Sequence, residues 1–253
     1  MQNIKILNMD IYITKDYDEM SKKAAEVVAS VVKEKENPIL GLATGGTPAG
    51  LYKELIAMNK AGEIDFSKTS AFNLDEYYPI SKESDQSYYY FMRENLFKHI
   101  NIDTDKTYIP DGSAEDVEKE SEAFDKLVRD TGGVDMQILG IGTNGHIAFN
   151  EPADNFPTKT QKVNLTESTI EDNARFFDNI DDVPKEAITM GIGTIMNSKR
   201  IIMLASGANK AEAIKETVLG NVRPQLPASI LQFHKDVTII LDEAAAKDLL
   251  ESL

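Results

Sequence analysis

The sequence predicts an α/β fold in which an open, mostly parallel sheet is covered by helices on both faces. Short apolar runs, typical of buried strands, alternate along the 253 residues with longer stretches of helical periodicity. No internal repeat, low-complexity tract or Pro/Gly/Ser linker marks a boundary between domains. We therefore expect a single domain over residues 1–253 with a Rossmann-like arrangement of strands and helices.

The individual elements follow from the apolar pattern and from capping signals. Strands are predicted at residues 4–8, 38–42, 70–73, 134–139, 200–205 and 237–241. Helices are predicted at residues 18–35, 49–60, 87–97, 114–129, 168–177 and 209–219, with a last helix after residue 241. Ser168 and Glu171 have the spacing of a capping box, and Gly220 stands where a helix should end.

Composition narrows the class of function. The formal net charge of -15 argues against a nucleic-acid surface, because such surfaces depend on Lys and Arg. Without cysteine, the chain has no disulfide, thiolate nucleophile or Cys-based zinc site. No apolar run reaches the length of a membrane span, and the start lacks the regions of a signal peptide. We expect a cytoplasmic protein with a small-molecule substrate and no membrane or nucleic-acid partner.

Four chemically unusual segments each follow a predicted strand. They are Thr44-Gly45-Gly46-Thr47, Asp75-Glu76, residues 140–151, and residues 206–210. In open α/β sheets, ligands bind in the crevice outside the carboxyl ends of the strands. The sequence therefore predicts that all four segments converge on one site.

The first and the last of these segments are suited to an anion. Residues 44–47 precede a helix, whose first N–H groups and dipole attract negative charge. A glycine turn with a helix N-cap, and no ligand, is an equally good interpretation of this segment alone. The P-loop pattern is absent, so a nucleoside triphosphate is not expected. Lys210 begins a predicted helix, where a cation is mildly unfavourable, and this position favours an anionic partner.

The other two segments carry groups suited to proton transfer. Asp75 and Glu76 follow a buried strand, where a carboxylate can have a raised pKa and act as a general base, although the pair could also cap the next helix. His146 lies in a glycine-lined loop with Glu151 nearby, whereas a lone histidine is more often structural. Arg175 taken by itself would be interpreted as a surface arginine.

The glycines at positions 140, 142 and 145 also match the dinucleotide pattern G-x-G-x-x-G. That pattern requires a helix directly after the third glycine and an acidic residue about 20 positions on, at the end of the next strand. Asn150 and Pro152 break any helix there, and no strand ends in an acid at that distance. No dinucleotide cofactor is expected.

Five groups of residues stand in order over nearly the whole chain. They are Leu42-x-Thr44-Gly45-Gly46-Thr47-Pro48, Asn73-Leu74-Asp75-Glu76-Tyr77, Gly142-x-x-Gly145-His146-Ile147-Ala148-Phe149-Asn150-Glu151-Pro152, Asn173-x-Arg175-Phe176-Phe177, and Lys210. This combination closely resembles the glucosamine-6-phosphate deaminase family, and its G-H-I-A-F-N-E-P run is the most specific part. The resemblance implies an enzyme of amino-sugar catabolism that couples an aldose–ketose isomerisation to deamination. Glucosamine 6-phosphate and water would give fructose 6-phosphate and ammonium.

The resemblance also implies roles for individual residues. Asp75 matches the base that takes the C2 proton, and His146 with Glu151 matches the pair that opens the pyranose ring. Asn144 stands where the best-known members have Asp, and its amide can orient His146 but adds no negative charge to support the imidazolium. The positions that match the phosphate site are Thr44, Gly45, Gly46, Thr47, Arg175 and Lys210. No cofactor and no metal is implied.

Regulation and assembly can be compared in the same way. Longer, hexameric members have an activator site for N-acetylglucosamine 6-phosphate, built from basic residues after the E-P turn. Here the stretch reads Thr160-Gln161-Lys162-Val163-Asn164, and the chain ends at Leu253 without the longer C-terminal segment. We expect the short, non-allosteric type, a monomer or small homo-oligomer, with a lid around residues 160–182.

Two other functions use a similar fold. A 6-phosphogluconolactonase would have a comparable phosphate loop and G-H turn, but its family continues without A-F-N-E-P and needs no C2 base. A sugar-phosphate sensor resembling the effector domains of sugar-operon regulators would carry a DNA-binding helix-turn-helix, whereas this chain begins directly with a strand and is acidic. The sequence therefore favours the deaminase.

Overall fold

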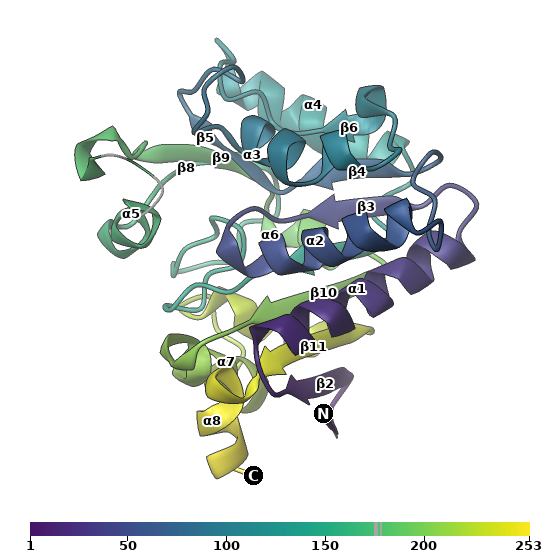
Figure 1. Cartoon of the computed structure of the whole chain (residues 1–253). Coiled ribbons are helices and arrows are strands. Elements are labelled where there is room, and N and C mark those ends of the chain that lie inside the picture. The colour runs from purple at the N-terminus through teal and green to yellow at the C-terminus, as the bar shows by residue number, and fades with distance from the viewer. Residues whose placement is uncertain (175–176, 178) are drawn as a thin grey trace.

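An eight-stranded sheet forms the centre of the computed structural model, which describes residues 1–174, 177 and 179–253 (Figure 1). The strand order is β1-β2-β11-β10-β7-β3-β4-β6. The bounds are β1 Gln2–Ile6, β2 Met9–Thr14, β3 Ile39–Leu42, β4 Ser70–Asn73, β6 Thr107–Tyr108, β7 Met136–Leu139, β10 Arg200–Ala205 and β11 Val237–Asp242. Within this sheet β1 and β2 are antiparallel and the other described neighbours are parallel. The predicted α/β class is confirmed.

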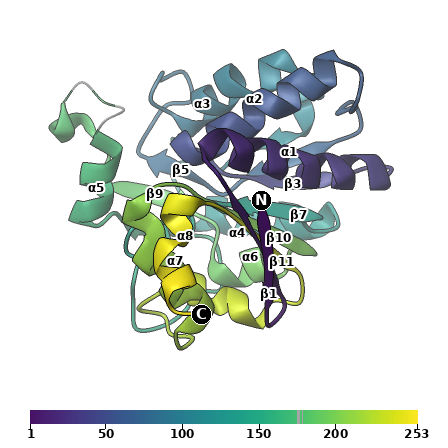
Figure 2. The same cartoon turned by 60° about the horizontal axis from the view of Figure 1, so that its bottom comes forward.

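Helices cover both faces of the large sheet. The pair α1 and α2 packs over one face, and the pair α7 and α8 over the other (Figure 2). The bounds are α1 Tyr17–Glu34, α2 Gly46–Lys60, α3 Tyr88–Asn95, α4 Val117–Asp130, α5 Glu167–Asn173, α6 Ile192–Met196, α7 Ala211–Leu219 and α8 Glu243–Glu251. Strands β7 and β11 are buried along their whole length, as expected for parallel strands covered on both sides. None of the helices described is both long enough and apolar enough to cross a membrane.

The N-terminus forms a hairpin where one strand at residues 4–8 was predicted. β1 runs antiparallel to β2, and the turn between them places Leu7 at a φ of 53°. β2 then pairs in parallel with β11. Its buried residues Met9, Ile11 and Ile13 alternate with partly exposed Asp10 and Tyr12. This alternation has the period of a half-exposed strand, and a search for continuous apolar runs overlooks it.

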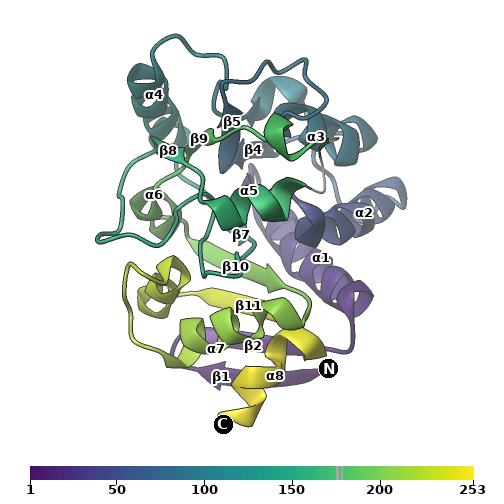
Figure 3. The same cartoon turned by 90° about the vertical axis from the view of Figure 1, so that its left-hand side faces the viewer.

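A second, smaller sheet was not predicted. It has the order β5-β9-β8 and is antiparallel, with β5 Asp75–Tyr78, β8 Gln161–Asn164 and β9 Glu186–Thr189. A separate apolar cluster joins Tyr77 and Ala187 of this sheet to Phe149 and Leu165. β8 leads directly to α5, which lies in front of β7 and β10 in Figure 3. The small sheet therefore carries α5 to the edge where the large sheet's parallel strands end.

Several helix boundaries differ from the predicted ones. α2 begins at Gly46 instead of residue 49, and α7 begins at Ala211 after a 3-10 turn, Ala208–Lys210. The capping box at Ser168 is wrong, because Thr166 caps α5 and accepts a hydrogen bond from the N–H of Thr169. Thr and Ser cap helices by the same chemistry, so the sequence alone does not choose between neighbouring candidates. Gly220 does end α7 as predicted.

The start of α6 must pass very close to the chain that leads into β8. A Cβ on Gly191 would lie 2.3 Å from the carbonyl oxygen of Lys159, and a Cβ on Gly193 would lie 2.5 Å from that of Thr158. Asp125 of α4 holds the same stretch by accepting hydrogen bonds from the N–H and hydroxyl of Thr160 at 3.0 and 2.7 Å. The base of the small sheet is thus fixed between α4 and α6.

We expect Gly191→Ala to lower the free energy of unfolding by about 1–3 kcal/mol, because the added methyl group forces rigid backbone apart. Urea denaturation followed by circular dichroism measures the change. Gly140→Ala is the control, since a Cβ there meets no atom within 4 Å. Equal stability of the Gly191 variant and the wild type would contradict the tight packing.

Candidate active site

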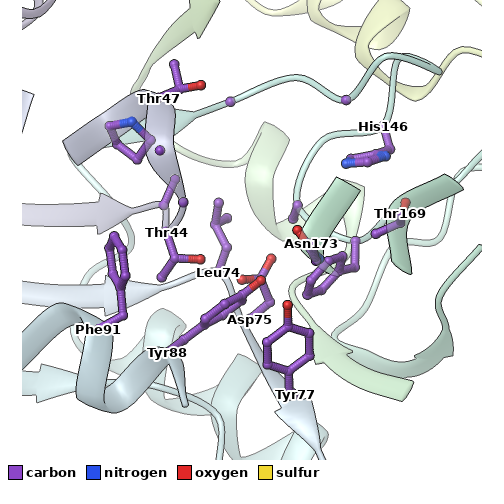
Figure 4. Close-up of a pocket in the computed structure, with 18 of the residues that line it drawn as sticks. Thr44, Thr47, Leu74, Asp75, Tyr77, Tyr88, Phe91, His146, Thr169 and Asn173 are labelled. Carbon is purple, nitrogen blue, oxygen red and sulfur yellow. The ribbon is translucent and has the colours of Figure 1, made fainter. Parts of the chain in front are cut away.

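The four segments singled out in the sequence meet at one cavity of about 420 Å³. Each follows the carboxyl end of β3, β4, β7 or β10, and residues from all four line the cavity. In Figure 4, Asp75 lies between Thr44 on one side and His146 on the other. The parallel register of the large sheet produces this convergence, as predicted.

Residues 44–47 form the start of α2. Gly45 occupies the N-cap position at a φ of 99°, a left-handed conformation that favours glycine, and provides no side-chain cap. The first-turn N–H groups of a helix have no partner inside it, and here they belong to a segment that lines the cavity. The hydroxyl of Tyr17 fixes this turn, accepting from the N–H of Gly50 and donating to the carbonyl of Gly46, each at 2.7 Å. The geometry suits an anion better than a side-chain N-cap.

Lys210 lines the same cavity from the segment that follows β10. It is the last residue of the 3-10 turn after β10 and occupies the N-cap position of α7. Its backbone N–H donates to the carbonyl of Gly207 at 3.1 Å. A cation and a helix N-terminus therefore face one cavity from β10 and β3.

Side chains alternate along strand β5, so those of Asp75 and Glu76 point to opposite faces of the strand. Asp75 and Tyr77 line the cavity, whereas Glu76 points away and accepts hydrogen bonds from the N–H groups of Tyr77, Tyr88 and Tyr89 at 2.8–2.9 Å. The helix-capping role considered as an alternative for this pair is taken by Glu76, which accepts the first two N–H groups of α3 beside the N-cap residue Ser87. Asp75 remains available to the cavity.

Burial sets the ionisation of both carboxylates. Asp75 is 6% exposed, and burial, together with the charge of Glu76, raises its pKa to about 8. Burial also raises the pKa of Glu76 to about 7, even though its three backbone donors act in the opposite direction. Desolvation likewise raises the pKa of Tyr77 to about 12. At neutral pH the Asp75 carboxyl group, which faces the cavity, can therefore both gain and lose a proton.

His146 and Glu151 are paired, as predicted, across the tight loop after β7. Nδ1 of His146 lies 3.3 Å from Oε2 of Glu151, a contact that is not aligned as a hydrogen bond. Asn144 joins them, donating to Oε2 of Glu151 at 2.8 Å and accepting the backbone N–H of His146 at 3.1 Å. Gly142 is required beneath the ring, because a Cβ there would lie 2.3 Å from it.

The second carboxylate oxygen of Glu151 faces α5. Its Oε1 accepts hydrogen bonds from the hydroxyls of Thr166, at 3.2 Å, and Thr169. Burial acts to raise the pKa of Glu151, but His146 and the side-chain donors outweigh it and lower the pKa to about 2. Glu151 is therefore a fixed anion that links the histidine loop to α5.

The sequence analysis assigned no role in the site to several residues that line the cavity, some on or beside α5 and some aromatic. Thr169, Asn173 and Phe177 line the cavity, and so do Tyr77 and Tyr88, whose rings lie 4.7 Å apart. A polar-apolar alternation after Asp75 could have indicated Tyr77, whereas Tyr88 is brought in by the fold. Arg175, expected in the phosphate site, lies outside the described residues. The glycine loop at residues 140–145 is not followed by a helix, which agrees with the rejection of a dinucleotide pattern.

Fold and site together define an α/β protein equipped for acid–base chemistry on a small ligand. The model of one family, described as glucosamine-6-phosphate isomerases/6-phosphogluconolactonase, matches residues 15–240, and the chain belongs to this family. Among its relatives is the glucosamine-6-phosphate deaminase of Thermoanaerobacter sp. (strain X514), 56% identical over 94% of each chain. The enzyme of that name from Clostridium perfringens (strain 13 / Type A) is 54% identical over 94% of this chain and 99% of its own.

Solved structures agree with this relationship. One described as a monomeric glucosamine-6-phosphate deaminase is 44% identical, with a TM-score of 0.92 over 94% of this chain and 99% of the other. A 6-phosphogluconolactonase from Plasmodium vivax, 23% identical, has a TM-score of 0.73 over 95% and 92% of the two chains and shares the fold. The predicted family is confirmed.

Asp75→Asn should make the folded protein more stable at alkaline pH. An acid whose pKa rises from 3.8 unfolded to about 8 folded holds its proton more tightly in the native state, so wild-type stability falls between those pH values. Even half of that shift corresponds to about 3 kcal/mol. The asparagine variant escapes this loss, so its advantage should be small near pH 4 and largest above pH 8. Denaturant unfolding across this range measures it, and a constant difference would contradict the raised pKa.

Proposed function

We propose that this protein is a glucosamine-6-phosphate deaminase, which converts glucosamine 6-phosphate and water to fructose 6-phosphate and ammonium. The observation that carries the proposal is the buried Asp75, with a pKa of about 8, facing the same cavity as His146. The likeness to deaminases at 53–56% identity supports the substrate. A coupled assay for ammonium and fructose 6-phosphate tests it, because both products must appear in equal amounts.

The phosphate of the substrate would bind where positive groups meet. In this proposal the first turn of α2 provides backbone N–H groups, and Lys210 provides a charge from the end of β10. The residues assigned to the phosphate are Thr44, Gly45, Gly46, Thr47, Arg175 and Lys210. Arg175 follows α5 in the sequence and would join the site from that side.

Ring opening needs one proton removed from the C1 hydroxyl and one delivered to the ring oxygen. His146 can carry out such a transfer, since an imidazole both accepts and donates protons near neutrality. Glu151 stays ionised, with its pKa lowered to about 2, and supports the imidazolium. Asn144 holds both groups by one hydrogen bond to each. Here the amide orients the pair without adding charge.

Isomerisation needs one base that moves a proton between adjacent carbons. We assign this role to Asp75, which would take the proton from C2 and return it to C1. A second proton passes from the substrate's ammonium group to the C1 oxygen, so that the reaction runs through an enolamine. The resulting imine at C2 adds water and releases ammonium, which gives the ketose. Because its pKa is raised to about 8, Asp75 is a stronger base than an exposed carboxylate, and the cationic amine of the substrate would favour its ionised form.

The buried base is also what favours a deaminase over a lactonase. Hydrolysis of a lactone requires attack by water on an ester and no removal of a carbon-bound proton. A carboxylate that is 6% exposed costs stability at neutral pH, and this cost is understandable where proton abstraction from C2 is required. The absence of ammonium release from glucosamine 6-phosphate, with turnover of a phosphogluconolactone, would reverse this choice.

A lid around residues 160–182 is part of the proposal. α5 places Thr169 and Asn173 on the cavity and is carried by the small sheet at one side of the large one. Closure of such an element over bound sugar would exclude water and bring Arg175 to the phosphate. We also propose that the protein acts as a monomer or small homo-oligomer, since a structure with a TM-score of 0.92 is described as monomeric.

Asp75→Asn should lower the rate of C2 proton exchange with solvent deuterium by about 100- to 10,000-fold, because an amide keeps the shape of the base but cannot accept a proton. Proton NMR of glucosamine 6-phosphate in deuterium oxide measures the exchange. Asp130→Asn, in an exposed ion pair with Lys126 on α4, is the matched control and should exchange normally. Exchange at the wild-type rate in the Asp75 variant would remove this residue from the role of base.

Lys210→Ala should raise KM about 10- to 100-fold with a smaller change in kcat, since a charged contact contributes about 1.5–3 kcal/mol. Steady-state kinetics on glucosamine 6-phosphate give both constants. Lys215→Ala removes a lysine from α7, the helix that begins directly after Lys210; Lys215 pairs with Glu212 at 2.7 Å, and its loss should leave KM unchanged. If both variants raise KM equally, the effect of Lys210 is one of general charge and not of phosphate binding.

A further inference from the structure

A fifth strand end, not singled out in the sequence, carries a buried carboxylate beside the site. Asp242 is the last residue of β11 and is 7% exposed. In the parallel pairing of β10 with β11, Ala205 lies opposite Leu241. The residues that follow, Ser206 and Asp242, are therefore brought side by side at the carboxyl edge of the sheet.

Asp242 accepts hydrogen bonds from two parts of the chain, the loop after β10 and the start of α8. Its Oδ2 accepts the hydroxyl of Ser206 at 2.5 Å, and its two oxygens accept the N–H of Gly207 at 3.0 and 3.1 Å. Its Oδ1 also accepts the N–H of Ala245 at 2.7 Å, which caps the N-terminus of α8. The carboxylate itself is not among the residues that line the cavity.

The contact at Gly207 continues to the cavity through the backbone. Gly207 has a φ of 95°, and its carbonyl accepts the N–H of Lys210 at 3.1 Å, which closes the 3-10 turn. Three residues of this loop, Ser206, Asn209 and Lys210, line the cavity. A glycine in a left-handed turn has many alternative conformations, and the carboxylate that holds its N–H selects one of them. The position of Lys210 therefore depends on Asp242 through Gly207.

We propose that Asp242 is a positioning residue for the anionic end of the substrate: by clamping the Ser206–Gly207 segment it fixes the turn that presents Lys210 to the cavity. The inference rests on the proposed function, in which Lys210 binds the phosphate. A bare carboxylate this close to a bound anion would repel it. The three donors on Asp242 and the positive end of α8 offset that charge.

Two substitutions separate the clamp from the helix cap. Asn and Ser are about as good as Asp at an N-cap position, so Asp242→Asn and Asp242→Ser can both keep α8 capped. Neither can accept the Ser206 hydroxyl and the Gly207 N–H with a charged group. Asp116→Asn is the matched control, because Asp116 caps α4 by accepting the N–H of Lys119 at 3.1 Å and does not line the cavity.

The experiment measures steady-state kinetics on glucosamine 6-phosphate, together with calorimetric binding of that sugar phosphate and the melting temperature. We expect each Asp242 variant to raise KM and Kd about tenfold, the loss of one charge-assisted hydrogen bond, with kcat within about threefold of wild type. Asp116→Asn should keep the wild-type KM and Kd.

Kinetics and calorimetry together distinguish failure of the positioning role from failure of the proposed reaction. If the Asp242 variants melt earlier but keep the wild-type KM and Kd, or lose kcat alone, Asp242 is structural and the proposal is overturned. If wild type binds the sugar phosphate without turning it over, and the Asp242 variants bind it about tenfold more weakly, the proposed reaction fails while the positioning role stands. A wild-type protein that neither binds nor converts the sugar phosphate would overturn both.

Discussion

The parallel register of the central strands is the constraint on which the rest of this structure depends. Backbone hydrogen bonds from β4 through β3, β7 and β10 to β11 all align strands that run in one direction. Their carboxyl ends must then meet at one edge, whatever the loops contain. Segments separated by up to about two-thirds of the chain reach one cavity in this way, and their chemistry is decided by the few residues that follow each strand.

Three carboxylates near this edge have different electrostatic roles because their partners differ. Asp75 is buried, and burial together with the charge of Glu76 raises its pKa to about 8. Glu151 is also largely buried, but His146 and the side-chain donors Thr169 and Asn144 lower its pKa to about 2. Glu76 accepts hydrogen bonds from three backbone N–H groups, that of Tyr77 and two at the start of α3. One is thus suited to gain a proton, one to remain charged, and one to hold a helix.

The sequence predicted the features that depend on local pattern. Continuous apolar runs identified β3, β4, β7, β10 and β11. The glycines and polar residues after them identified Thr44, Asp75, His146 and Lys210, all of which line the cavity. What it did not predict depends on distant pairing. The small sheet exists because short segments around residues 75, 161 and 186 meet in space, and none has a strong pattern of its own.

The same distinction holds within the site. Glu151 was placed with His146 from proximity in sequence, whereas its contacts with Thr166 and Thr169 depend on where α5 lies. Asp242 was missed because an acid before a helix is an ordinary N-cap, and its bond to Gly207 appears only when β10 and β11 are paired. Residues that act through a neighbour carry little signal in a single sequence.

The N-terminal hairpin has a consequence for how the large sheet meets its surroundings. β2, with its buried Met9, Ile11 and Ile13, would be an exposed edge strand able to pair with another chain if it were left uncovered. β1 covers it with a short, largely polar strand on which Lys5 pairs with Asp10 across the ladder at 3.5 Å. The opposite border, β6, is two residues long. A short polar strand at one border and a two-residue strand at the other both discourage edge-to-edge pairing between copies of this chain.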